Sequence, residues 1–354
     1  MYLKYIFIAI IIILVIWAVL INPKQEEPKN LSMYLVVMSF GLLGTDHLEV
    51  LNFLNPQLDI STELNWMEYS ISIFSLVMGV WLNINEKKQY QVFNLLGENN
   101  KQSLASNNYK IKKIGVGVVR ERIIDFMLPI EEKGWNKDTN DLINEIIRRE
   151  TEYLEGFPIL EDIYITSMAS IPYTILFGVR LDNKKTVKYI DYAMNKVSSK
   201  HSYVLLPDKV KNQKKSALKI VESLNDGEEL LLSLSVTYEV KQNAIEDFNI
   251  ENQVTISREN IGENVIKSQE EVRNIANQVV SYLINNSSNI KKIHVVAAIP
   301  GMLAVELGRV IRNRSNSLPN IIVYHYNARS TPVYEYGILV NNKNKVAELI
   351  ERRV

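Results

Sequence analysis

The chain has 354 residues, enough for about two domains at a working figure of about 150 residues each. It has no Cys, which excludes a disulfide scaffold, a thiolate zinc site and a cysteine nucleophile. Lys and Arg together number 40, as do Asp and Glu, so a strongly basic nucleic-acid coat is excluded and DNA is not an expected partner. The charges are uneven, because residues 1–84 carry only three basic and seven acidic side chains.

The N-terminal quarter predicts membrane helices. Residues 5–21 are 17 consecutive uncharged residues, and the segment 3–22 spans about 30 Å as a helix, the thickness of a bilayer core. A cleaved signal peptide is disfavoured, because this apolar run is longer than usual and no small-residue cleavage site precedes Pro23. A second helix is predicted at 66–84, with Trp66 and Trp81 near its ends. A third crossing at 31–53 stays open, since its apolar part is short.

Flanking charges predict the orientation. Residues 45–65 carry acidic side chains and no Lys or Arg, whereas Lys87 and Lys88 follow the last apolar run. By the positive-inside rule, the loop is outside and everything after residue 85 is cytoplasmic. The predicted domains are therefore a membrane region at 1–84, a polar linker at 85–106 and a cytoplasmic domain at 107–354.

From residue 107 strand-like and helix-like stretches alternate, which predicts an α/β fold with a largely parallel sheet. The predicted strands are Lys110–Val119, Asp162–Thr166, Thr186–Tyr192, Glu229–Tyr238, Lys291–Ala297, Asn320–His325 and an antiparallel edge at Val333–Leu339. The predicted helices are Thr139–Leu154, Pro172–Leu181, Glu263–Ile284 and Pro300–Arg312.

An internal repeat divides this domain into two similar units, at about 107–207 and 220–354. The segment DIYITSMASIPYTILFGVRLDNKKTVKYIDY is echoed by KIHVVAAIPGMLAVELGRVIRNRSNSLPNIIVYHY about 130 residues later. In each, an apolar strand leads through small residues to a Pro at a helix start, and a second strand ends in paired Tyr. Pro172 and Gly178 are predicted to correspond to Pro300 and Gly308. Ligands of α/β sheets bind beyond the carboxyl ends of the strands, and helix starts suit phosphates, so two such units predict a composite pocket for phosphates and bases. The alternative is that both prolines merely start ordinary packed helices.

These two segments resemble the signatures of the SAVED domain, a fusion of two CARF-like units, and the resemblance extends over about 107–354. With membrane segments ahead of it, the chain is similar to transmembrane SAVED effectors of CBASS anti-phage operons. The resemblance implies a multi-pass protein of the bacterial inner membrane. It implies a cyclic di- or trinucleotide ligand made by a cGAS/DncV-like nucleotidyltransferase. It also implies homo-oligomers on ligand binding, and disruption of the lipid bilayer that kills the cell.

Candidate ligand-binding residues follow from these positions. Backbone contacts to phosphates are expected at Ser167, Ala169 and Ser170 and at Ala298, Pro300 and Gly301. Bases are expected to stack on Tyr192 and Tyr326. Further contacts are expected from Arg329, Arg120 and Arg122. For each, the alternative is an ordinary packed Tyr or a solvated Arg.

No catalytic motif stands out, so the chain is predicted not to be an enzyme, with no cofactor and no metal site. Two other functions stay open: a membrane-anchored enzyme that degrades a cyclic nucleotide, and a non-lethal scaffold that recruits a separate killer protein.

Overall fold

The computed structural model describes residues 74–75, 88–97, 117–126, 128–156, 162–181, 186–195, 200–210, 217–262, 265–286, 288–341 and 347–352. Contacts divide the chain into two compact parts, Met1–Lys88 and Gln89–Val354. Nearly all described residues, including both of the repeated units, belong to the second part. Within the described residues, no helix is both long and apolar enough to cross a membrane. The predicted membrane helix at 3–22, the possible third crossing at 31–53, and all of the predicted helix at 66–84 except Phe74 and Ser75 lie outside them.

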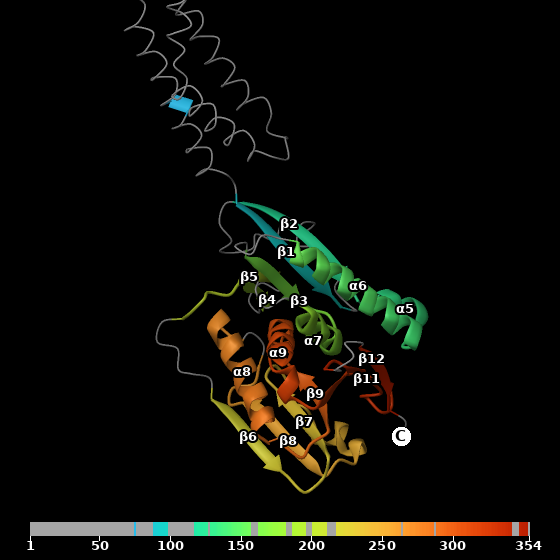
Figure 1. Ribbon diagram of the computed structural model, residues 1–354. Coiled ribbons are helices and arrows are strands. Elements are labelled where there is room, and N and C mark those ends of the chain that lie inside the picture. The colour runs from blue at the N-terminus through green and yellow to red at the C-terminus, as the bar shows by residue number, and fades with distance from the viewer. Residues whose placement is uncertain are drawn as a thin grey trace, which may run out of the picture. The chain divides into compact units, whose positions relative to one another are not determined.

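The first sheet has the strand order β2-β1-β3-β4-β5 (Figure 1). Its strands are β1 (Lys88–Leu96), β2 (Gly117–Asp125), β3 (Ile163–Ser167), β4 (Val187–Asn195) and β5 (Lys200–Leu205). β3 is parallel to both β1 and β4, and β4 continues beyond β3 to pair antiparallel with β5. Two helices follow β2, namely α5 (Leu128–Lys133) and α6 (Lys137–Glu155). Asn136 caps α6 by accepting a hydrogen bond from the Thr139 N–H at 2.9 Å.

The predicted linker at 85–106 is wrong for residues 88–96, which form β1. Phe93 and Leu95 on this strand are completely buried, and β1 lies between β2 and β3. Val92–Leu96 is an apolar run interrupted only by Asn94, and the Asn- and Gln-rich sequence around it led to the prediction of a linker. The Asn94 side chain donates a hydrogen bond to Glu121 of β2 at 2.8 Å. A buried polar group with a partner is compatible with a central strand.

The second sheet has the order β12-β11-β10-β9-β7-β8-β6. Its strands are β6 (Leu218–Ser223), β7 (Glu229–Ser235), β8 (Asn252–Arg258), β9 (Lys292–Ala298), β10 (Asn320–Tyr324), β11 (Tyr336–Leu339) and β12 (Glu348–Glu351). The inner strands β8, β7, β9 and β10 are parallel to one another. The predicted antiparallel strand at 333–339 is shorter, and it is not the edge, because β12 pairs with its outer side.

Two helices, α7 (Ile171–Arg180) and α9 (Gly301–Asn313), lie between the two sheets (Figure 1). They pack without a gap where Gly178 meets Gly308: a Cβ on Gly178 would lie 2.1 Å from the Val305 carbonyl oxygen, and one on Gly308 would lie 2.1 Å from that of Ile175. The core that surrounds this crossing includes residues of both sheets. The repeated glycines therefore bring the two units together.

Polar side chains also join the two units. Gln269, at the start of α8 (Gln269–Asn286), is completely buried; its Oε1 accepts from the Tyr189 N–H at 2.8 Å and its Nε2 donates to the Tyr189 carbonyl at 3.0 Å. Asn140 of α6 donates to the Ala347 carbonyl beside β12 at 2.8 Å. The α/β prediction is thus confirmed, and the sheets share one core.

Candidate functional site

The two strand–helix junctions, β3 to α7 and β9 to α9, have the same pattern of burial. From Ile163 to Val179 and from Ile293 to Arg309, buried and half-buried residues follow in the same order. This register aligns Gly178 with Gly308 as predicted, but it aligns Ser170, not Pro172, with Pro300. Pro172 lies in the first turn of α7, whereas Pro300 is the N-cap of α9. The predicted correspondence of Pro172 with Pro300 is therefore wrong by two residues. A Pro can occur at either position of a helix start, because a missing backbone N–H is tolerated at both.

The two junctions touch each other. A Cβ built on Gly301, the first residue of α9, would lie 2.2 Å from the carbonyl oxygen of Ser167, the last residue of β3. Only Gly allows this approach, so the start of α9 lies directly against the carboxyl end of β3. The predicted phosphate-facing residues of the two units are thus neighbours.

Hydroxyl groups line the first junction. The Ser167 and Thr174 hydroxyls lie 3.0 Å apart, and the Thr174 hydroxyl donates to the Ser170 carbonyl at 2.9 Å. The Ser170 hydroxyl oxygen is buried and has no hydrogen-bond partner in the described part of the chain. Ala169 is buried below them. Thr174 was not among the predicted residues, although its place one turn into α7 could have suggested it.

The second junction is lined by the backbone. Ala297, Ala298 and Pro300 are half-buried, and the Ala298 carbonyl accepts hydrogen bonds from the N–H groups of Val236 and Thr237 at 3.0 Å each. The first N–H groups of a helix have no partner within the helix, so the starts of α7 and α9 provide donors. Together the junctions offer N–H groups and hydroxyls to an anionic ligand.

Tyr326 and Arg329 lie in the loop after β10 and are both exposed. The Tyr326 ring packs edge-on against buried Tyr334, with centroids 5.5 Å apart. The ring centroid of the preceding residue, His325, lies 4.9 Å from that of Trp135, and the Trp135 ring stacks on the rings of Tyr173 and Tyr336. Burial lowers the pKa of His325 to about 4, so it is neutral at physiological pH.

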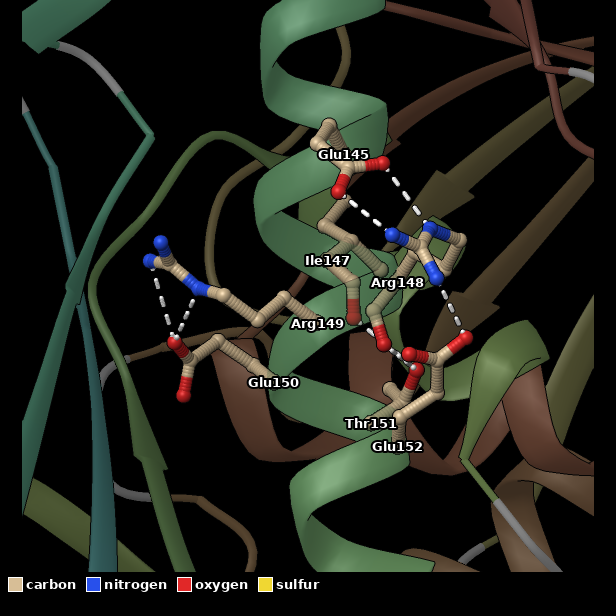
Figure 2. Close-up of polar contacts among 7 residues, drawn as sticks. All are labelled: Glu145, Ile147, Arg148, Arg149, Glu150, Thr151 and Glu152. Atoms are coloured by element: carbon tan, nitrogen blue, oxygen red, sulfur yellow. Dashed lines mark hydrogen bonds and ion pairs between the residues drawn. The ribbon is translucent and has the colours of Figure 1, made fainter.

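The predicted arginines of β2 lie elsewhere in the first unit. Arg122 forms an ion pair with buried Glu150 of α6, and its guanidinium lies 3.8 Å from the centre of the Tyr153 ring. The hydrogen bond to Glu150 is the main cause that raises the pKa of Arg122. Figure 2 shows Glu150 on α6 together with Arg149, its second ion-pair partner. Arg122 thus has partners within the first unit, and the side chains of Arg120 and Tyr192 lie outside the described set.

Figure 2 also shows a second set of charges on α6. Arg148 donates to Glu145 at 2.5 Å and to Glu152 at 2.6 Å, and all three side chains are more than half exposed. These i,i+3 and i,i+4 pairs are exposed to solvent, which screens them, so they stabilise the helix only weakly. They contribute to the helix and not to the site.

A buried charged network near the junctions was not predicted. The Tyr189 hydroxyl of β4 donates to Glu306 of α9, which also accepts from Arg309 at 3.0 Å. Burial, reinforced by the Glu306 charge, raises the pKa of Tyr189 well above its usual value. The available signal was Glu306 itself, a single carboxylate inside the apolar run of a helix.

No group of three or more His, Asp or Glu side chains in the described ranges is placed to hold a metal ion. The donors at the junctions suit non-covalent contacts to phosphates, and the aromatic face of Tyr326 suits contacts to bases.

Comparison with known proteins agrees with this architecture. Residues 141–340 match the sequence profile of SAVED, the "SMODS-associated and fused to various effectors sensor domain". No curated protein matches the chain.

Among solved structures, the Acinetobacter baumannii Cap4 SAVED/CARF-domain receptor with 2'3'3'-cAAA has 9% identity and a TM-score of 0.45, over 74% of this chain and 54% of that one. Its complex with 3'3'3'-cAAA has 10% identity and a TM-score of 0.45, over 73% and 57%. Moraxella osloensis Cap4 has 12% identity and a TM-score of 0.43, over 74% and 55%. This chain spans little more than half the length of these structures. Because the family profile covers more than half of its residues, the chain belongs to the SAVED family of sensor domains.

Proposed function

We propose that this protein is a membrane-anchored sensor of a cyclic di- or trinucleotide in CBASS anti-phage defence. The contact between Gly301 and Ser167 carries the proposal, because it places the starts of α7 and α9 side by side at the carboxyl ends of their sheets. Two adjacent helix starts suit a compact ligand with more than one phosphate. The sensor description of the family supports the same reading.

In this proposal, the half-buried residues of the two junctions contact phosphates, and exposed Tyr326 and Arg329 contact bases and phosphates from the loop after β10. The ligand is made by a cGAS/DncV-like nucleotidyltransferase. In this proposal the protein binds the ligand and releases it unchanged.

Ligand binding is proposed to join neighbouring protomers. Assembly of the sensor domains would raise the local concentration of the attached apolar segments at 3–22 and 66–84, which the sequence predicts to lie in the inner membrane. Ser70, Ser72, Ser75 and Gly79 provide small residues for close helix packing within the second segment. The expected result is disruption of the bilayer.

A thermal-stability screen tests the sensor proposal. The full chain in detergent would be heated with a panel of cyclic di- and trinucleotides that includes 2'3'3'-cAAA and 3'3'3'-cAAA. A true ligand at about 100 times its Kd stabilises the fold by about 2.7 kcal/mol, which raises Tm by several degrees. Recovery of the intact nucleotide after incubation separates a sensor from an enzyme that degrades it. An unmoved Tm with every nucleotide would overturn the proposal.

Dye-loaded vesicles that carry the full chain test the membrane step. Leakage that begins only after the active nucleotide is added supports lesion formation by the protein alone. Vesicles that stay sealed at saturating nucleotide would instead favour a scaffold that recruits another protein.

A further inference from the structure

Three loops at the carboxyl edge of the second sheet each expose a large apolar side chain. These are Tyr238 after β7, Ile261 after β8 and Tyr326 after β10, with exposed fractions of 60%, 39% and 54%. Exposed aromatic rings grouped at one edge of a sheet are typical of a binding surface. They lie where α/β folds bind ligands.

Backbone hydrogen bonds place Tyr238 beside the second junction. The adjacent residue, Thr237, donates its N–H to the Ala298 carbonyl at 3.0 Å. The Gly262 N–H donates to the Val236 carbonyl at 3.2 Å, so the loop that carries Ile261 is tied to the same place. Tyr238 is therefore one residue from a direct contact with the segment that leads into α9.

Tyr326 follows β10, which lies on the other side of β9 from β7. In the sheet, β9 has β7 on one side and β10 on the other, so the strands that lead to Tyr238 and Tyr326 are about 10 Å apart. Two Tyr side chains that follow strands this far apart can each meet a different base of one small ligand. β9, the strand that leads to the start of α9, lies between β7 and β10.

Tyr326 is also held in position although it is exposed. Its edge packs on buried Tyr334, whose ring lies 6.3 Å from that of Phe248, and Phe248 in turn packs edge-on against Tyr324 at 4.9 Å. A ring that is already immobilised loses little conformational entropy when a base stacks on it. This aromatic support links the exposed ring of Tyr326 to the rings of Tyr334, Phe248 and Tyr324.

We propose that Tyr238 and Tyr326 are paired stacking platforms for two bases of the ligand, in the loops that follow the two strands flanking β9. This inference rests on the proposed function and deepens it by naming Tyr238. Tyr192, which the sequence paired with Tyr326, lies on β4 of the first sheet, in the strand predicted for it.

The test measures binding by the full chain in detergent. The probes are the cyclic di- and trinucleotides of the panel with one adenine replaced by the fluorescent base 2-aminopurine. Tyr238→Ala and Tyr326→Ala are each expected to weaken binding by about 5- to 150-fold, the loss of one stacked base. Tyr238→Phe keeps the ring and is expected to bind within about 3-fold of the wild type, whereas Tyr238→Leu loses the stacking face and most of the affinity. Val221→Ala is the control, because Val221 is 54% exposed on edge strand β6 and faces no junction.

Fluorescence distinguishes stacking from a general loss of structure. Stacking on Tyr quenches 2-aminopurine. At saturating protein, we expect emission to be restored by the Ala variant of the Tyr that stacks on the labelled base, while the Tm of that variant stays at the wild-type value. If the wild type binds and both Ala variants bind equally well, the platform inference is wrong and the sensor proposal survives. If the wild type binds no member of the panel, both are overturned.

Discussion

Glu306 is a carboxylate buried between two sheets, and its partners explain why it is tolerated. A buried carboxylate without partners is strongly destabilising, but Glu306 accepts from the Tyr189 hydroxyl and from Arg309. Burial alone would lower the pKa of Arg309, but Tyr189 and Glu306 outweigh it and raise that pKa. The three groups act as one unit that joins β4 to α9.

We expect Tyr189→Phe to lower the free energy of unfolding by about 1–3 kcal/mol, since it removes one donor from a buried carboxylate. Urea unfolding followed by circular dichroism measures this. Tyr282→Phe is the matched control, because Tyr282 also donates to a carboxylate, Glu222, but at an exposed position. An equal loss in both variants would contradict the role of burial.

His325 makes stability depend on pH. Its pKa is about 4 in the folded chain because of burial, against about 6.5 when unfolded. The unfolded state therefore binds a proton first as pH falls. Stability is fully present above about pH 6.5 and is lost between about pH 6.5 and 4, by about 3 kcal/mol in total. Burial lowers the pKa of His294 as well, so its contribution has the same sign.

His325→Phe keeps a ring against Trp135 and removes the titrating group. We expect its unfolding free energy to fall less steeply than that of the wild type between about pH 7 and pH 5. Urea titrations of both proteins at each pH measure the two slopes. Parallel slopes would show that other groups account for the dependence.

At the scale of elements, the crossing of α7 and α9 is the tightest contact between the two units. We expect Gly308→Ala to destabilise the fold by at least about 2 kcal/mol, because its Cβ would lie 2.1 Å from the backbone oxygen of Ile175. Gly156→Ala is the control, since its Cβ would meet nothing closer than 3.4 Å. Thermal unfolding compares them, and a small, equal shift in both would show that the helices can separate easily.

Strand β1 leads to a prediction about where the folded domain begins. A fragment of residues 107–354 lacks β1, which lies between β2 and β3, and we expect it to be unfolded or aggregated. A fragment of residues 86–354 keeps β1 and is expected to unfold cooperatively in urea. Cooperative unfolding of the shorter fragment would show that β1 is dispensable.

The sequence predicted those elements that are mainly apolar. β3, β7, β9, α7 and α9 are such runs, and their positions agree within a few residues. β6 was not predicted, because almost all its residues are exposed. β8 was not predicted either, although its buried and half-buried residues alternate, with Val254 and Ile256 buried. That alternation was a readable strand signal.

The site was predictable only in part. Small residues at two helix starts indicated where Ser167 and Gly301 lie, but not that they touch, because their contact joins positions far apart in the sequence. Arg122 was also not predictable from its neighbours in the sequence. Nothing in β2 indicates that its charge is paired with Glu150, which lies on a later helix, α6.

At the scale of the whole molecule, we expect the N-terminal segments to anchor the protein. The full chain is expected to stay with membranes after alkaline carbonate extraction, since 3–22 alone is long enough to cross a bilayer core. Deletion of residues 1–85 is expected to release the remainder into the supernatant. Full-length protein in the carbonate supernatant would contradict the predicted anchor.

The Gln269 side chain has a consequence for how the protein is made. It accepts from the N–H of Tyr189, which comes 80 positions earlier, so the ribosome must finish part of the second unit before this N–H of β4 has its partner. Contacts between distant segments slow folding, because a long loop must close before they form. We infer that the first unit stays incompletely folded during synthesis. Both units then acquire their native structure in one shared step.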